Sequence, residues 1–69
     1  MAIDVNGTCY TDTDLAEMWN LYHLARVAGH ETPHARILWA VKEYAKTRPD
    51  TTPANIYKAF DRTRTSYYG

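Results

Sequence analysis

Apolar side chains recur every three or four residues in three segments of this 69-residue chain, which is the spacing of amphipathic α-helices. The predicted helices span about residues 12–28, 33–47 and 53–66. Each follows a threonine suited to cap a helix N-terminus, and these residues are Thr11, Thr32 and Thr52. Pro33 and Pro53 favour the first turns of two of these helices, and Gly29 predicts a left-handed stop after the first.

Residues 2–10 follow a two-residue alternation instead. Ile3 and Val5 alternate with polar residues and are followed by Asn6-Gly7. Asn-Gly is the strongest short signal of a β-hairpin, because both central residues of a type I′ turn need positive φ. An isolated two-stranded hairpin is only marginally stable in water, so we expect this one to pack on the helices. We therefore predict a mostly α fold, with an N-terminal β-hairpin packed on a three-helix bundle, as a single domain over residues 1–69.

Two of the predicted helices have a broad apolar stripe. At about 100° per residue, the first helix gathers Leu15, Met18, Trp19, Tyr22 and Ala25 on one side, widened by Leu21, Leu24 and Ala28. The second helix gathers Ile37, Leu38, Val41, Tyr44 and Ala45. The width of the first stripe indicates a central helix that packs on more than one side.

A tryptophan lies on the opposite side of the second predicted helix. Trp39 falls almost directly across from the apolar stripe, with Ala35, Lys42 and Lys46 around it. Two interpretations are open. The hairpin could cover Trp39 and form a second small core. Alternatively, Trp39 is an exposed anchor of a contact surface, with a partner or a second copy, because Trp is enriched at binding hot spots.

The third predicted helix has a polar, basic outer side. Its apolar face carries Ile56, Ala59, Phe60, Thr63 and Tyr67, and its outer face carries Asn55, Lys58, Arg62 and Thr65. Arg and Lys pair with guanine, Asn pairs with adenine, and Thr contacts bases or phosphate, so these residue types suit a helix in the DNA major groove. An ordinary solvated face has the same composition, and both interpretations are open.

Charge and cysteine content bear on the surface of the protein and on its cellular compartment. Residues 1–32 hold five acids and one base, whereas residues 33–69 hold seven bases and three acids, although the whole chain is neutral. This asymmetry indicates an acidic and a basic face, or chance in a short chain. The lone Cys9 cannot form an internal disulfide, and the sequence has no apolar run long enough for a membrane span. Residues 1–4 lack the basic and apolar regions of a secretory signal, so we expect none. We therefore expect a cytoplasmic protein without a membrane partner.

Catalytic and metal chemistry are not indicated by the sequence. The candidate zinc ligands are Cys9, His23, His30 and His34, and they lack the spacing of a four-ligand site. Cys9 falls on a predicted strand beside acids, which does not favour an activated nucleophile. The three glycines stand apart, so no phosphate-binding loop is formed. We expect no catalytic residue, no metal and no cofactor, and therefore a binding protein rather than an enzyme.

Two stretches carry weak resemblances. "TTPANIYKAFDRTRTS", residues 51–66, resembles the recognition helix of helix-turn-helix and winged-helix regulators. That resemblance implies that Thr52, Asn55, Lys58 and Arg62 face DNA while Ile56 and Phe60 hold the helix. "VNGTCYTDTDLAEMW", residues 5–19, is similar in style to small proteins of tailed bacteriophages. That likeness implies transcriptional control or interference with a host protein, in the host cytoplasm.

Two functions follow as hypotheses. In the first, a basic and aromatic helical surface binds a host or partner protein. In the second, helix 53–66 enters the DNA major groove, and a homodimer would be expected because one small helix rarely supplies enough affinity. Arg36 and Arg48 would then join the lysines of the second helix in holding phosphates. The candidate binding residues for both are Asn55, Lys58, Arg62, Thr65, Arg64, Trp39, Lys42 and Lys46.

Overall fold

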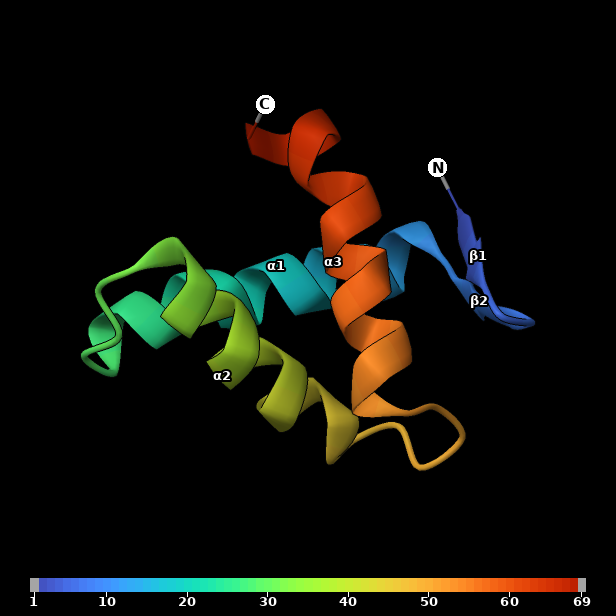
Figure 1. The fold of residues 1–69 in the computed structure, drawn as a ribbon, viewed down its shortest axis with the longest axis horizontal. Helices are drawn as coiled ribbons and strands as arrows, with labels where there is room; N and C mark the ends of the chain where they lie inside the picture. Colours follow the sequence, from blue (N-terminus) through green and yellow to red (C-terminus); the bar gives the residue numbers. More distant parts are fainter. Residues whose placement is uncertain (1, 69) are drawn as a thin grey trace.

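A computed structural model describes residues 2–68, and the side chains of residues 2–64. The described residues form a two-stranded antiparallel hairpin followed by three helices (Figure 1). The elements are β1 (Ile3–Val5), β2 (Thr8–Tyr10), α1 (Asp12–Val27), α2 (Pro33–Ala45) and α3 (Pro53–Tyr68). The predicted fold class is confirmed, and the helix ends differ from the predicted ones by one or two residues, which is the usual uncertainty at fraying helix ends.

Local capping signals produce these elements. Asn6 and Gly7 take φ values of 51° and 86°, as a type I′ turn requires. The Thr11 hydroxyl accepts a hydrogen bond from the Asp14 amide, and the Asp14 carboxylate accepts one from the Thr11 amide, which completes a capping box. The Thr32 and Thr52 hydroxyls accept bonds of 3.1 and 3.2 Å from the amides three residues on. The predicted turn and caps are therefore present.

The core lies where the three helices and the hairpin meet. Trp19 of α1 contacts Phe60 of α3 edge-to-face, with ring centroids 4.9 Å apart. Its indole nitrogen donates a hydrogen bond of 2.8 Å to the buried Thr63 hydroxyl. The buried apolar residues are Val5, Tyr10, Leu15, Met18, Trp19, Ala25, Ile37, Ala40, Val41, Tyr44, Ile56, Ala59 and Phe60. Trp19 thus ties the middle of the first helix to the last.

Three residues assigned to the apolar stripes are exposed instead. Leu24 is 46% exposed and Leu38 is 49% exposed, and Ala28 caps the end of α1 in solvent. The prediction that Leu24 and Ala28 widen the apolar stripe of α1 is wrong, because the buried side of α1 is limited to Leu15, Met18, Trp19 and Ala25. The prediction that Leu38 belongs to the apolar stripe of α2 is also wrong, because the buried side of α2 is centred between Ile37 and Val41 and includes Ala40. Leu38, about 100° around the helix from Ile37, therefore falls on the outer flank.

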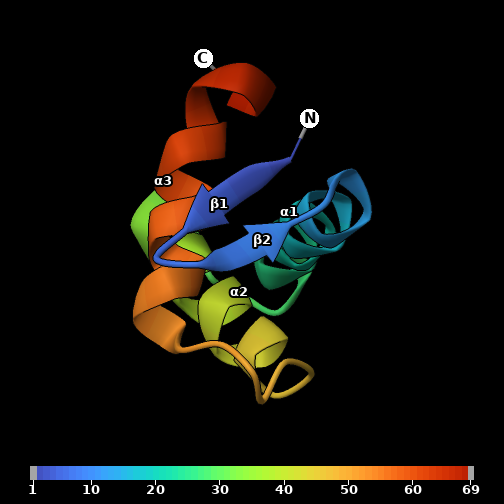
Figure 2. The same cartoon turned by 90° about the vertical axis from the view of Figure 1, so that its right-hand side faces the viewer.

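The hairpin packs on α1 and α3. β1 lies against α3 and β2 lies against α1, on the side of α3 away from α2 (Figures 1 and 2). Val5 and Tyr10, one from each strand, are fully buried there. The hairpin does not form a second core over Trp39, which excludes one of the two interpretations of that residue. The outer face of α2 is therefore left without a covering element among the described residues.

Candidate functional site

The outer face of α2 carries a hollow of about 320 Å³. Its walls are Ala35, Leu38, Trp39 and Lys42, which are spaced three or four residues apart on one side of the helix, and His30 from the preceding loop. We call these five residues the α2 groove. Leu38 is half exposed, Trp39 is partly exposed and Lys42 is exposed. Of these residues, Trp39 is of the type that is enriched at protein contact sites.

The loop between α1 and α2 positions His30 at the groove. Gly29, at φ 99°, reverses the chain after α1, and the His30 amide donates a hydrogen bond of 3.0 Å to the Ala25 carbonyl. Arg36 then donates to the carbonyl oxygens of His30 and Glu31 at 3.2 and 2.5 Å. With the loop held in this way, the His30 ring lies 5.9 Å from the Trp39 ring, centroid to centroid. His30 therefore forms one wall of the groove.

Charge in the groove is positive. Lys42 has no ion-pair partner among the side chains that the structure describes, and no carboxylate lines the groove. The nearest acid along the helix is Glu43, whose carboxylate binds the Lys46 ammonium at 2.8 Å. Lys46, predicted as a binding residue, is therefore occupied within its own helix. Lys42 and Trp39, which helical spacing places on one side of this helix, both line the groove, together with Leu38 and His30.

Two of the residues of α3 that were predicted to face DNA contact the hairpin instead. The Asn55 side-chain oxygen accepts a hydrogen bond of 3.0 Å from the Asn6 side chain in the hairpin turn. The Arg62 guanidinium donates one of 2.6 Å to the Asp4 carbonyl oxygen. Lys58 is exposed, and the side chain of Thr65 lies outside the described residues. The hairpin thus engages two of the three proposed base-reading side chains that are described.

Arg64 completes the predicted set. It is exposed on α3, and its guanidinium lies 3.6 Å from the Asp61 carboxylate one turn earlier. Such an exposed pair contributes little to stability, and it partly neutralises the basic side of α3. Of the predicted basic residues, Lys46 and Arg64 thus each lie beside a carboxylate, and Arg62 is bound to a backbone carbonyl of the hairpin.

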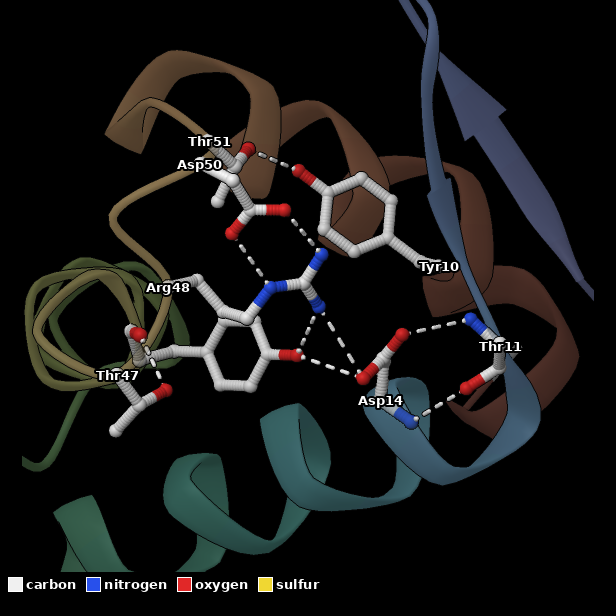
Figure 3. A network of polar contacts seen from close by, with 8 residues as sticks. Tyr10, Thr11, Asp14, Thr47, Arg48, Asp50 and Thr51 are labelled. Carbon is white, nitrogen blue, oxygen red and sulfur yellow. Dashed lines mark hydrogen bonds and ion pairs between the residues drawn. The ribbon is translucent and has the colours of Figure 1, made fainter.

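A cluster of polar side chains surrounds Arg48 in the loop between α2 and α3 (Figure 3). The Arg48 guanidinium contacts both carboxylate oxygens of Asp50, at 2.9 and 3.0 Å. It also contacts an Asp14 oxygen at 3.2 Å and the Tyr44 hydroxyl at 3.1 Å. Its carbon lies 5.8 Å from the centre of the Tyr10 ring, in cation–π range. This cluster was not predicted, because its members come from four separate segments.

The ionisation of the Arg48 cluster favours a structural role. The hydrogen bond to Asp50 is the main cause that raises the pKa of Arg48 above its usual value. Burial is the main cause that raises the pKa of Tyr44 to about 12. The Tyr44 hydroxyl, which donates to Asp14 at 3.2 Å, therefore stays protonated at neutral pH. With Arg48 occupied on several sides, the cluster joins α1, the loop and the hairpin and does not present a free charge for a phosphate.

Comparisons with models of protein families, with curated proteins and with solved structures found no match to this chain. Within the described residues, no group of three or more His, Cys, Asp and Glu side chains is arranged to hold a metal ion. None of the described helices has the length and apolar character needed to cross a bilayer.

Proposed function

We propose that this chain is a non-catalytic binding protein that docks on a partner protein through the α2 groove. The observation that carries the proposal is the exposure of Leu38 beside Trp39 on a helix face that no other described element covers. Large apolar side chains grouped around a hollow mark contact sites more often than isolated ones do. The fold supports the groove from behind, because Ile37, Val41 and Tyr44 anchor the same helix in the core.

The alternative function, DNA binding through α3, has weaker support. Lys58 is exposed and suits a phosphate or a base, but Asn55 and Arg62 make hydrogen bonds with the hairpin. A recognition helix would have to release both contacts to read bases. The neutral net charge also supplies little of the non-specific attraction on which DNA affinity depends.

The likeness of residues 5–19 to small bacteriophage proteins bears on the kind of partner. That likeness implies transcriptional control or interference with a host protein, and a host protein is the partner proposed for the groove. The groove presents Trp39 and Lys42 to it, which are an aromatic and a basic contact of the kind that the sequence predicted.

Photo-crosslinking from defined positions tests both functions at once. The full chain is produced in cells of the organism in which it functions, and it carries Leu38→p-benzoylphenylalanine or, as the matched control, Lys58→p-benzoylphenylalanine. Both positions are exposed, and they lie on α2 and α3, respectively. We expect a discrete protein adduct from position 38 and none of that size from position 58. Absence of an adduct at 38, or nucleic-acid adducts at 58, would overturn the proposed function.

A further inference from the structure

The spacing of the side chains that line the α2 groove suits the packing of another helix against it. Ala35 and Trp39 are four residues apart, and so are Leu38 and Lys42, so the two pairs form neighbouring ridges along α2. The hollow between such ridges accepts a ridge of side chains from a second helix, which is how helices pack in protein interiors. Ala35 presents only a methyl group, so the backbone of an incoming helix can approach closely at this end of the groove.

An incoming helix would meet one lysine side chain in the groove. Lys42 is the lysine or arginine that lines the groove, and it lies one turn beyond Leu38. Docking would take the Lys42 ammonium partly out of water, which is unfavourable unless an opposite charge faces it. No carboxylate lines the groove among the described residues, and Glu43, the nearest acid along the helix, contacts Lys46 at 2.8 Å instead. A carboxylate of the partner would supply the compensating charge.

We infer that the α2 groove binds an acidic amphipathic helix of the partner protein, one that places an apolar side chain against Leu38 and Trp39 and an Asp or Glu one turn away against Lys42. This inference rests on the proposed function and specifies its partner. Apolar contacts supply the affinity, and the Lys42–carboxylate pair sets the direction and register of the helix. A partner with a basic helix is rejected, because two cations would face each other as the groove loses water.

Synthetic peptides test the chemistry of the occupant. The first is an Ala-rich helix with one central Leu and Glu residues four positions before and after it. The second replaces both Glu by Lys, and the third keeps Glu but replaces Leu by Ala. Binding to the full-length ¹⁵N-labelled chain is followed by the two Trp side-chain NH resonances, which Trp39→Phe assigns. Trp19, 3% exposed, serves as the internal control.

We expect the first peptide to shift the Trp39 resonance, to leave that of Trp19 in place, and to bind at least tenfold more tightly than the second and third. Lys42→Glu should reverse the ranking of the first two peptides, while Lys58→Glu should not. Equal binding of the acidic and basic peptides, or an unchanged Trp39 resonance at 1 mM peptide (about the Kd of a 4 kcal/mol contact), overturns the inference.

The outcomes separate this inference from the proposed function. A protein adduct from position 38 together with equal peptide binding leaves the proposed function standing and removes the acidic helix. Loss of the adduct removes the proposed function itself. A dimer in light scattering that Leu38→Asp converts to a monomer identifies a second copy of the chain as the occupant, and it also overturns the inference.

Discussion

Arg62, near the middle of α3, donates a hydrogen bond of 2.6 Å to the backbone carbonyl of Asp4 in β1, 58 residues earlier in the chain. Asp4 pairs with Cys9 in the hairpin register, so this bond holds the middle of the hairpin against the helix. The Asn6 side chain adds a second link, to Asn55 in the first turn of α3. Arg62, which sequence analysis proposed as a DNA contact, thus holds the hairpin against α3.

Arg62→Ala is expected to loosen the hairpin. Removing one hydrogen bond should lower the free energy of unfolding by about 1 kcal/mol, and amide hydrogen exchange in β1 and β2 should accelerate more than exchange in α2. Arg64→Ala is the matched control, because the contact of Arg64 among the described side chains is with exposed Asp61 of its own helix. Equal exchange rates in the two variants would show that the Arg62 bond does not hold the hairpin.

The Trp19–Thr63 hydrogen bond is expected to contribute more to stability. Thr63→Val keeps the shape of the side chain but leaves the buried Trp19 N–H without its 2.8 Å acceptor, so the free energy of unfolding should fall by about 1–3 kcal/mol. Urea denaturation measures the loss. In a Trp19→Phe background the same replacement should cost clearly less, because no indole N–H then remains to be satisfied. Equal costs in the two backgrounds would contradict this account.

Sequence reasoning succeeded where the signal is local. The Asn6-Gly7 turn, the Thr11 capping box and the stop at Gly29 each depend on a few adjacent residues, and all three are present. Helix ends are set by such short-range contacts, so the order and type of the elements could be predicted. The aromatic and basic part of the α2 groove, Trp39 with Lys42, also followed from helical periodicity alone.

Long-range placement could not be predicted in the same way. The sequence predicted that the hairpin packs on the helices but not that it packs on α1 and α3 rather than on the outer face of α2. This position decides that Arg62 is engaged while Trp39 is uncovered. The contact between Arg48 and Asp14 likewise depends on how the loop after α2 returns to α1. The burial of Ala40 in place of Leu38 reflects the rotation of α2 about its axis, which only its neighbours determine.

The Asp14 carboxylate should make stability depend on acid pH. Partial burial raises the pKa of Asp14, but several contacts with the charged carboxylate outweigh the effect of burial, so the pKa lies below 3.8. These contacts are the hydrogen bond from the Thr11 amide, the hydroxyl groups of Thr11 and Tyr44, and the charge of Arg48. A depressed pKa gives stability that is present above pH 3.8 and is lost as pH falls through the folded-state value. Asp14→Asn should therefore flatten the decline in unfolding free energy below about pH 4.

The control for the acid dependence is Asp61→Asn, which removes an exposed carboxylate 3.6 Å from Arg64. Chemical denaturation at a series of pH values between neutral and strongly acid conditions measures both variants. An unchanged acid slope in Asp14→Asn would show that Asp14 is not the group responsible.

Gly29→Ala should destabilise the end of α1 and the loop that carries His30. Gly29 has φ 99°, a conformation that L-residues avoid, although no atom lies within 4 Å of the position of an added Cβ. The cost is therefore one of backbone conformation alone, about 1 kcal/mol after the entropy lost from the unfolded chain is subtracted. Thermal unfolding measures it, and Ala28→Gly, at the neighbouring cap, is the comparison. A gain in stability for Gly29→Ala would contradict the expectation.

Ile37 and Leu38 provide the sharpest separation of core from binding surface, because they are adjacent on α2 and are 4% and 49% exposed. Ile37→Ala should lower the free energy of unfolding by about 2–4 kcal/mol through the cavity it leaves. Leu38→Ala should change it by no more than about 0.5 kcal/mol, since half of its surface is already in water. If the groove is the docking site, untagged Leu38→Ala protein will fail to compete with the crosslink formed from position 38, whereas the wild-type protein will compete. A folded Leu38→Ala variant that competes as well as the wild type would remove Leu38 from the contact surface.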